Sequence, residues 1–552
     1  MHDVFIIEAP GKVRVFQDLL RKVGVEAKVQ ATNGHICDFP KEPRDLGIDQ
    51  AFRPFNRILK NPETGRYIRD ALVGAKNVFI ATDADQEGDV IAWDVAELIA
   101  DIWPEPFRVR LKGMDEESVR QAITDATAVR KMDAVPGRTR AILDRMIGFT
   151  LSHKGAKVGR IRTPLLGICR DEALPVAKLR LTAPSKDRGR PWIAECDVLD
   201  PISMKIAKQL EEVVFPELDR RRESKPYTSK PKHTGEVLVR AGDVLGLKPH
   251  EAQQKMQDLY ETGQMSYPRA GSKGLSPAIS AKIADIVKKS RYNFDPANVA
   301  TKTDADVHDA PYPIGAVNVT HDPENVGDHE GMRVLIARDL VKTGQSHIIE
   351  EAFGSVAGDH LRKLGFSETV ADFVSKLPWR RENGPRYPGQ EAWPESKVIN
   401  RLPETVLLEA AMKKGLGRPS TWARHIENFM KDDLVDSQLK LTDKGQAWAA
   451  ASPEVLLDPR LSAAIESACE RVTDAIMIDP DREPWELLSE KIIKALPADI
   501  RQKLIEAVAD VKQRPKIDLT AMYRATVGLD EVLEAAKEKT YSLGPKAPIF
   551  ED

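Results

Sequence analysis

Residues 78–88 of the chain read VFIATDADQEG, and this stretch decides the fold. Its first four residues form a short apolar run typical of a buried strand, and a helical pattern follows over residues 90–100. The N-terminus repeats this order, since the apolar run of residues 4–7 is broken at residues 9–11 and followed by a helical pattern over residues 13–23. Strand–loop–helix units of this kind predict an α/β domain with a mostly parallel sheet. Ligands of such sheets bind at the carboxyl ends of the strands, where both loops lie.

The loop after the second of these strands gathers three carboxylates. Asp83, Asp85 and Glu87 alternate along the chain, and alternate residues of an extended segment point to one side. Three carboxylates without imidazole or thiol suit Mg²⁺, a hard cation that takes oxygen ligands, and without a cation they would repel one another. The alternative is an acidic loop in which Asp85 caps the following helix, and for an isolated motif this is the more frequent case.

The loop after the first strand offers a further carboxylate and an ammonium group. Glu8 and Lys12 lie at the same predicted edge of the sheet, and Lys12 at a helix start could hold a phosphate. A solvated turn is the better explanation of this loop when it is taken alone. Together, the two loops predict a centre for phosphoryl chemistry.

A third candidate lies in residues 265–269, MSYPR. Tyr267 could act as a nucleophile toward phosphorus, and Arg269 could neutralise charge on the phosphoryl oxygens. The alternative is a loop tyrosine that packs against an exposed arginine.

Weaker signals lie elsewhere along the chain. Arg160 and Arg162 stand close together, which suits phosphate binding but also an ordinary helix surface. His308 with its neighbour Asp309 could contact phosphate or form a simple turn, and residues 415–421, GLGRPST, end one helix and begin the next. Residues 220–232 contain six basic residues and two prolines, which predict a positively charged linker or hinge.

Composition limits the possible classes. A length of 552 residues suits three or four domains, and 41% hydrophobic with 30% charged residues excludes disordered, collagen-like and membrane-spanning classes. The net charge of −3 means that nucleic acid would be bound by local basic clusters. The four cysteines form no C-x-x-C pair, which argues against a zinc ribbon and indicates a reduced, cytoplasmic protein. No phosphate-cradling G-x-x-x-x-G-K-[ST] motif is present, so no nucleotide cofactor is expected.

Taken in order, these motifs resemble those of the type IA DNA topoisomerases. The family's E-S-P-x-K, G-H-I-x-D-L-P, T-D-x-D-x-E-G, G-R-V-Q, I-T-Y-x-R, H-E-A and G-I-G-R-P-S-T motifs correspond here to residues 8–12, 34–40, 82–88, 159–162, 265–269, 308–310 and 415–421.

The chain also departs from the family pattern. Gln86 stands where arginine is usual, Asp89 where glutamate is common, Arg162 at the glutamine position and Ala270 at a threonine position. Residues 308–313 also lack an arginine of the family segment. These departures suggest a divergent bacterial or mobile-element branch.

The resemblance implies a multidomain α/β + α fold in which a Toprim domain, a β-rich arch and helical domains form a toroid. The expected parts are a Toprim domain over residues 1–150, a helical DNA-binding domain over 151–185 and 403–480, the arch over 186–232 and 360–402, a helical domain with the tyrosine over 233–359, and a C-terminal helical extension over 481–552.

The resemblance also implies an activity. Such an enzyme cleaves single-stranded DNA through a 5′-phosphotyrosyl bond, passes a strand and religates, and so relaxes negatively supercoiled DNA without ATP. We expect a cytoplasmic monomer with no membrane partner. Two alternatives stay open, a Toprim nuclease or primase-like enzyme, and a DNA-binding homologue without catalysis.

The resemblance assigns three groups of residues. The catalytic group is Tyr267, Arg269, Lys12 and Glu8; the Mg²⁺ ligands are Glu8, Asp83, Asp85 and Glu87; and the DNA-binding group is His35, Arg160, Arg162, His308, Arg418 and Ser420.

Overall fold

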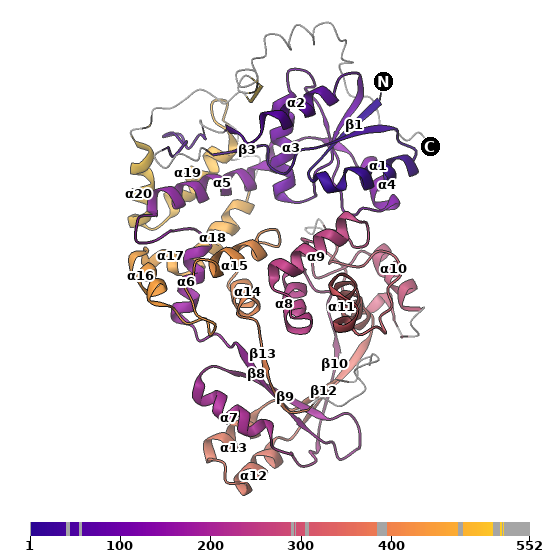
Figure 1. Ribbon diagram of the computed structural model, residues 1–552, viewed down its shortest axis with the longest axis vertical. Coiled ribbons are helices and arrows are strands. Elements are labelled where there is room, and N and C mark those ends of the chain that lie inside the picture. Colours follow the sequence, from indigo (N-terminus) through magenta and orange to yellow (C-terminus); the bar gives the residue numbers. More distant parts are fainter. Residues whose placement is uncertain are drawn as a thin grey trace.

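The computed structural model describes residues 2–39, 45–54, 58–288, 292, 294–303, 308–382, 395–472, 479–509, 511, 519–520 and 523. Figure 1 shows an α/β unit at one end of the molecule, an arch-like sheet at the other end, and helices between them. None of the described helices is both long and apolar enough to cross a membrane.

The N-terminal α/β unit contains the predicted parallel sheet. Its strand order is β2-β1-β5-β6-β7, in which β1, β2, β5 and β6 are parallel and β7 is an antiparallel edge strand. The strands are β1 (His2–Ile7), β2 (Ala27–Ala31), β5 (Ala75–Ile80), β6 (Phe107–Arg108) and β7 (Thr127–Ala128), and β3 (Cys37–Asp38) and β4 (Ile58–Leu59) form a separate antiparallel pair.

Helices cover both faces of this parallel sheet. Phe5 packs with Phe16 of α1 (Val13–Lys22) on one face, and Ile6 lies in a core with Val95 of α3 (Gln86–Ile99) on the other. The unit also contains α2 (Pro62–Ala71) and α4 (Glu116–Thr124). Because both faces are buried, the central strands are continuous apolar runs rather than alternating ones. This is why they could be predicted from the sequence.

The C-terminal helices pack against the long helix α5 (Lys131–Leu151). Leu143 of α5 shares a core with Leu488 and Ile492 of α19 (Pro484–Ala495) and Leu504 of α20 (Ala498–Ala509). Both α19 and α20 fall within the range expected to form a C-terminal helical extension. The rest of the predicted extension, beyond residue 511, lies almost entirely outside the described residues.

The helices between the two ends share one hydrophobic core. Leu165, Leu238, Leu340, Leu407 and Phe429 all belong to it, although they come from sequence-distant segments. Its helices are α6 (Arg162–Asp171), α8 (Thr234–Leu245), α9 (Pro249–Glu261), α10 (Pro277–Lys288), α11 (Asp328–Thr343), α14 (Pro403–Lys413), α15 (Trp422–Met430), α16 (Asp443–Ala451) and α17 (Glu454–Leu457), with α18 (Pro459–Glu470) beside them.

The arch sheet is antiparallel and has the strand order β10-β11-β12-β9-β8-β13. Its strands are β8 (Ala177–Ala183), β9 (Trp192–Val198), β10 (Arg220–Thr228), β11 (Ser346–Ala352), β12 (Arg380–Glu382) and β13 (Lys397–Asn400), accompanied by α7 (Pro201–Glu211), α12 (Ser355–Lys363) and α13 (Glu368–Lys376). One side of the arch leads through β13 into α14 and the other through β10 toward α8, and α8 packs against α14, so the chain closes a ring (Figure 1).

Two features of the arch differ from the sequence-based expectation. Strands β8 and β11 fall in ranges that we expected to be parts of the helical domains. The basic segment expected to be a linker forms strand β10 over most of its length and pairs with β11. Strand β10 lies at the edge of the sheet, where a proline such as Pro226 is tolerated because one side of the strand needs no partner.

Candidate active site

The carboxyl ends of β1 and β5 bring the two predicted loops together. Asp85 is the N-cap of α3, and its Oδ1 accepts a hydrogen bond from the Gly88 backbone N–H at 2.8 Å. A Cβ at Gly88 would overlap the backbone carbonyl of Asp83, so glycine lets the loop fold tightly onto the first turn of α3. The capping interpretation of Asp85 is therefore correct, but it uses only one of the two carboxylate oxygens.

The second oxygen of Asp85 faces Tyr267. The Tyr267 hydroxyl donates to Asp85 Oδ2 at 2.5 Å, and the Tyr267 side chain is almost inaccessible, with a relative exposure of 1% for the residue. Burial, followed by the charges of Asp85 and Asp83, raises the pKa of Tyr267 well above its usual value of 10. The phenol is thus protonated and needs an acceptor for its proton before it can act as a nucleophile.

Two aromatic rings hold Tyr267 in place. His308 stacks on it with ring centroids 4.2 Å apart, and Tyr260 meets it edge-on at 5.6 Å. His308 Nε2 donates to the Ala84 carbonyl at 2.8 Å, and burial lowers the pKa of His308 to about 4, so the ring is neutral at pH 7. The imidazole therefore positions the phenol as a flat neutral surface.

Lys12 and Asp83 form a buried ion pair beside this group. The Lys12 Nζ lies 2.6 Å from Asp83 Oδ1, and their side chains are 1% and 3% exposed. Lys12 also lies over the Tyr260 ring, 4.4 Å from its centroid. Burial alone would raise the pKa of Asp83, but Lys12 and Arg269 outweigh it and lower that pKa.

Glu8, which lies beside Asp83 and Asp85, has one carboxylate oxygen that is not used in a hydrogen bond within the described residues. Its Oε2 is buried and has no hydrogen-bond partner among the described residues. Burial, together with the charges of Asp83 and Asp85, raises the pKa of Glu8 to about 7. A carboxyl group with such a pKa can both give and take a proton near neutral pH.

Glu87 does not join the other predicted metal ligands. Its Oε2 lies 2.5 Å from His35 Nε2, and this hydrogen bond is the main cause of its lowered pKa. Among the described residues no three Asp, Glu, His or Cys side chains converge in the geometry of a metal site. Even so, the unpartnered Glu8 oxygen next to two further carboxylates is a donor set that suits a hard cation.

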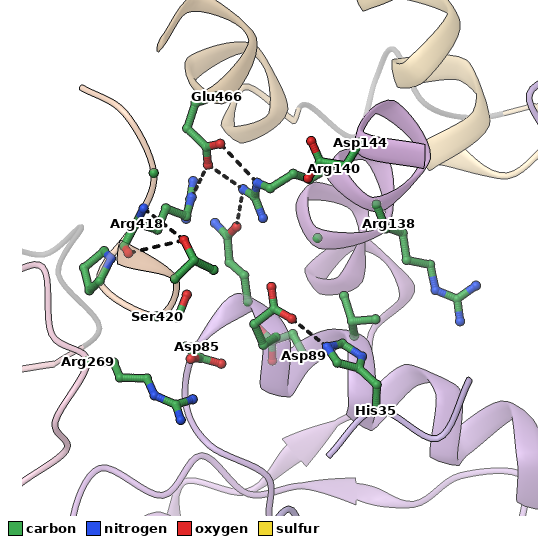
Figure 2. A pocket seen from close by; sticks show the side chains of 18 of the residues that line it. His35, Asp85, Asp89, Arg138, Arg140, Asp144, Arg269, Arg418, Ser420 and Glu466 are labelled. Atoms are coloured by element: carbon green, nitrogen blue, oxygen red, sulfur yellow. Dashed lines mark hydrogen bonds and ion pairs between the residues drawn. The ribbon is translucent and has the colours of Figure 1, made fainter. Parts of the chain in front are cut away.

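A cavity of about 1190 Å³ opens next to this group (Figure 2). Figure 2 shows Asp85 and Arg269 on one side of it and Glu466 with Arg140 on the opposite side. The basic side chains in its lining are Lys60, Arg110, Arg138, Arg140, Arg145, Arg160, Arg269, Arg418 and Arg424. A concentration of arginines around a cavity of this size suits a ligand with several phosphates.

The cavity brings together most of the residues predicted to bind DNA. His35, Arg160, His308, Arg418 and Ser420 all line it. Arg162 does not belong to its lining and pairs with Asp432 at 3.0 Å. Arg160 is in the wall, but its side chain is only 3% exposed and pairs with Asp144 at 2.7 Å.

Sequence reasoning missed Tyr260, Arg140 and Glu466. The buried positions of α9 follow helical spacing and mark Tyr260 as a core residue, without indicating that its hydroxyl lies 3.5 Å from Asp83 Oδ1. Arg140 and Glu466 are 326 residues apart in the sequence, so no local spacing could pair them.

Comparisons with known proteins cover both the α/β unit and the segment that carries Tyr267. A family model of the Toprim domain matches residues 3–113, and one described as DNA topoisomerase matches residues 130–353. The chain is 23% identical to the plasmid DNA topoisomerase I of Xylella fastidiosa over 501 residues, which covers 79% of this chain and 74% of that protein. It is 24% identical to DNA topoisomerase 1 of Thermotoga maritima over 480 residues, covering 78% and 74%.

A solved structure shares the fold. Full-length topoisomerase I from Thermotoga maritima matches 93% of this chain and 91% of its own, with a TM-score of 0.59 and 17% sequence identity. Toprim domains bind a divalent metal ion, and the matched range includes Glu8, Asp83 and Asp85.

Proposed function

The chain belongs to the type IA DNA topoisomerases, and from this premise we propose that Tyr267 is the nucleophile with which it breaks a DNA strand. The observation that carries the proposal is the 2.5 Å hydrogen bond from the Tyr267 hydroxyl to Asp85 at the carboxyl end of the Toprim sheet. This bond joins the tyrosine loop to the acidic loops that the sequence analysis singled out separately.

The chemistry follows from the neighbours of the hydroxyl. Tyr267 Oη forms a bond to a backbone phosphorus while the bond from phosphorus to the 3′-oxygen breaks. The phenol proton passes to Asp85, and the departing 3′-oxygen takes a proton from Glu8, whose pKa of about 7 suits that role. The product is a 5′-phosphotyrosyl bond, and because its energy matches that of the bond broken, the reverse reaction religates without ATP.

Arg269 and Lys12 are the cations of the reaction. The pKa of Arg269 stays above its usual value because Tyr267 and the Asp83 and Asp85 carboxylates outweigh its burial. A permanent guanidinium charge here stabilises negative charge on the phosphoryl oxygens in the transition state.

We propose Mg²⁺ as the divalent ion, held by Glu8 and Asp83 with Asp85. When bound, the ion neutralises negative charge on the phosphate. Because Lys12 is paired with Asp83 Oδ1, the Asp83 carboxylate would have to interact with Lys12 and the ion at the same time. Glu87 is the weaker candidate, because His35 already binds its carboxylate.

The proposed substrate is a single-stranded region of negatively supercoiled DNA. The nucleophile is buried behind the cavity, and a flexible single strand can enter such a site more easily than a stiff duplex. We further propose a monomer that works in the cytoplasm; the second point agrees with four cysteines that form no disulfide bond in the described part of the chain.

The test is to trap the covalent intermediate with denaturant on a labelled oligonucleotide. Wild-type protein should leave a tyrosine on a 5′ end, and Tyr267→Phe should leave none and relax no supercoiled plasmid. Tyr260→Phe is the matched control, since Tyr260 is equally buried and faces Asp83 rather than Asp85. An adduct mapped to Tyr260 would refute the assignment, and a Toprim nuclease, a primase or a non-catalytic homologue would form no adduct at all.

A further inference from the structure

Three arginines from three separate segments converge on one carboxylate in the cavity wall. Figure 2 shows Arg140 and Arg418 beside this carboxylate, Glu466. Glu466 lies on α18, and its Oε1 is 2.9 Å from Arg140 Nη2 of α5. Its Oε2 is 2.5 Å from Arg160 Nη1, and Arg418, from the loop between α14 and α15, pairs with its Oε1.

Glu466 is what allows these three cations to lie together. Burial, followed by the neighbouring charge of Arg140, lowers the pKa of Arg418. The same three arginines overcome the burial of Glu466 and lower its pKa to about 2, so it is ionised at any physiological pH. Without this carboxylate the arginines would repel one another in a partly buried place.

The cluster lies where a DNA backbone would pass. Its arginines line the same cavity as Asp85 and Arg269, and Ser420 lies beside Arg418. A guanidinium presents planar donors that fit a carboxylate and a phosphate oxygen pair alike. Each arginine is also held by a second partner, Gln86 for Arg140, Asp144 for Arg160 and Glu470 for Arg418, which keeps it near this spot.

We infer that Glu466 is a positioning residue that serves as internal counter-ion, holding in the DNA-free protein the arginines that a DNA backbone phosphate takes over on binding. The inference rests on the proposed function, because it assigns to that same cavity the position of one phosphate. The carboxylate therefore competes with DNA and keeps binding reversible, as an enzyme that must release its strand requires.

Removing the Glu466 charge should change DNA affinity in the opposite direction from removing an ordinary structural contact. The change destabilises the free protein, because Arg140 is left with the uncharged Gln86 and Arg160 and Arg418 keep one carboxylate each, Asp144 and Glu470. The cluster then carries an uncompensated positive charge, so DNA binding should become tighter. A merely structural glutamate would lose stability and DNA affinity together.

The experiment measures binding of a fluorescent oligothymidine to the full chain over a series of salt concentrations. Glu466→Gln should bind about tenfold more tightly, the gain expected for one charge-assisted contact. A plot of the logarithm of its binding constant against the logarithm of the salt concentration should be steeper by about 0.7, the value for one phosphate contact on a single strand. Its unfolding temperature should be lower without the oligonucleotide and should rise more when it is added.

Two further variants keep the test decisive. Glu466→Asp retains the charge but draws the carboxylate back by one methylene, so its affinity should lie between wild type and Glu466→Gln. Glu454→Gln makes the same change in net charge at an exposed pair with Arg170, and should bind like wild type.

Either of two results would overturn the inference. One is weaker or unchanged binding by both Glu466 variants, and the other is an equal gain in Glu454→Gln, which would reflect net charge alone. Adduct trapping on the wild-type protein tests the proposed function separately. A missing Tyr267 adduct would count against Tyr267 as the nucleophile, whereas the salt series measures only how tightly the oligothymidine binds.

Discussion

Lys12 and Asp83 face each other at 2.6 Å with almost no access to water, so solvent cannot replace either partner of the pair. Replacing Lys12 by the similarly shaped Met leaves the Asp83 carboxylate buried next to Glu8 with Arg269 as its remaining cation. Breaking a buried pair in this way costs about 3–5 kcal/mol. We therefore expect Lys12→Met to lower the free energy of unfolding by that amount in urea at pH 7.

The double variant Lys12→Met with Asp83→Asn is the control for that change. It removes both charges, so most of the lost stability should return, because the desolvated carboxylate is gone. A single variant as stable as wild type would mean that water reaches Asp83 and that the pair is not closed in solution.

At the scale of elements, Glu466 joins α18 to α5 and to the loops that carry Arg160 and Arg418. The pKa of about 2 lies below the ordinary 4.5 of a glutamate, so the unfolded chain takes up the proton first as pH falls. The stabilisation is therefore complete above about pH 5 and lost between pH 4.5 and 2. It amounts to about 3 kcal/mol as an upper figure.

The measurement compares unfolding of wild type and Glu466→Gln in urea. Wild type should be more stable at pH 7, and the difference should shrink as the pH falls toward 3. Glu454→Gln should differ little from wild type at either pH, because Glu454 is 76% exposed. A difference that stays constant with pH would show that packing, rather than charge, connects these elements.

The strands differ in how well they could be predicted from the sequence. The strands at residues 4–7 and 78–80 are confirmed because an apolar run buried on both faces is a local signal. The meeting of Glu8 and Asp83 followed from parallel strands that end at one edge. Strand β11, by contrast, was expected within a helical range, because its partners β10 and β12 come from distant parts of the chain.

The same limit applies to the site. Motifs pointed to Tyr267, Asp85 and Lys12, each within a short segment of characteristic spacing. The partners that define their chemistry, such as Tyr260 for Lys12 and Glu466 for Arg160, are brought together only by packing between helices. Charge pairs across hundreds of residues leave no periodic trace in a single sequence.

At the scale of the whole molecule, the Tyr267 hydroxyl is sealed between the Toprim unit and the helices that carry the tyrosine. The seal includes the bond to Asp85, and Lys282 of α10 meets Glu117 of α4 at 2.5 Å between the same two parts of the molecule. Because Tyr267 is only 1% exposed, we expect a DNA phosphorus to reach its hydroxyl when the two sides separate. The prediction is that the ring opens at this boundary during each cycle.

A reversible lock across that boundary tests this requirement. Lys282 and Glu117 are both exposed enough for cysteine substitution, and Cys37, Cys169 and Cys469 are buried. Cys196 is partly exposed, so it is replaced by Ser in every variant of this experiment. The double variant Lys282→Cys with Glu117→Cys, joined by a short reducible bifunctional thiol reagent, should lose plasmid relaxation almost completely and regain it on reduction. Each single-cysteine variant treated alike should stay active, because nothing joins its two sides. Full relaxation by the joined protein would place the opening elsewhere in the ring, with the arch strands β10 and β13 as the next boundaries to lock.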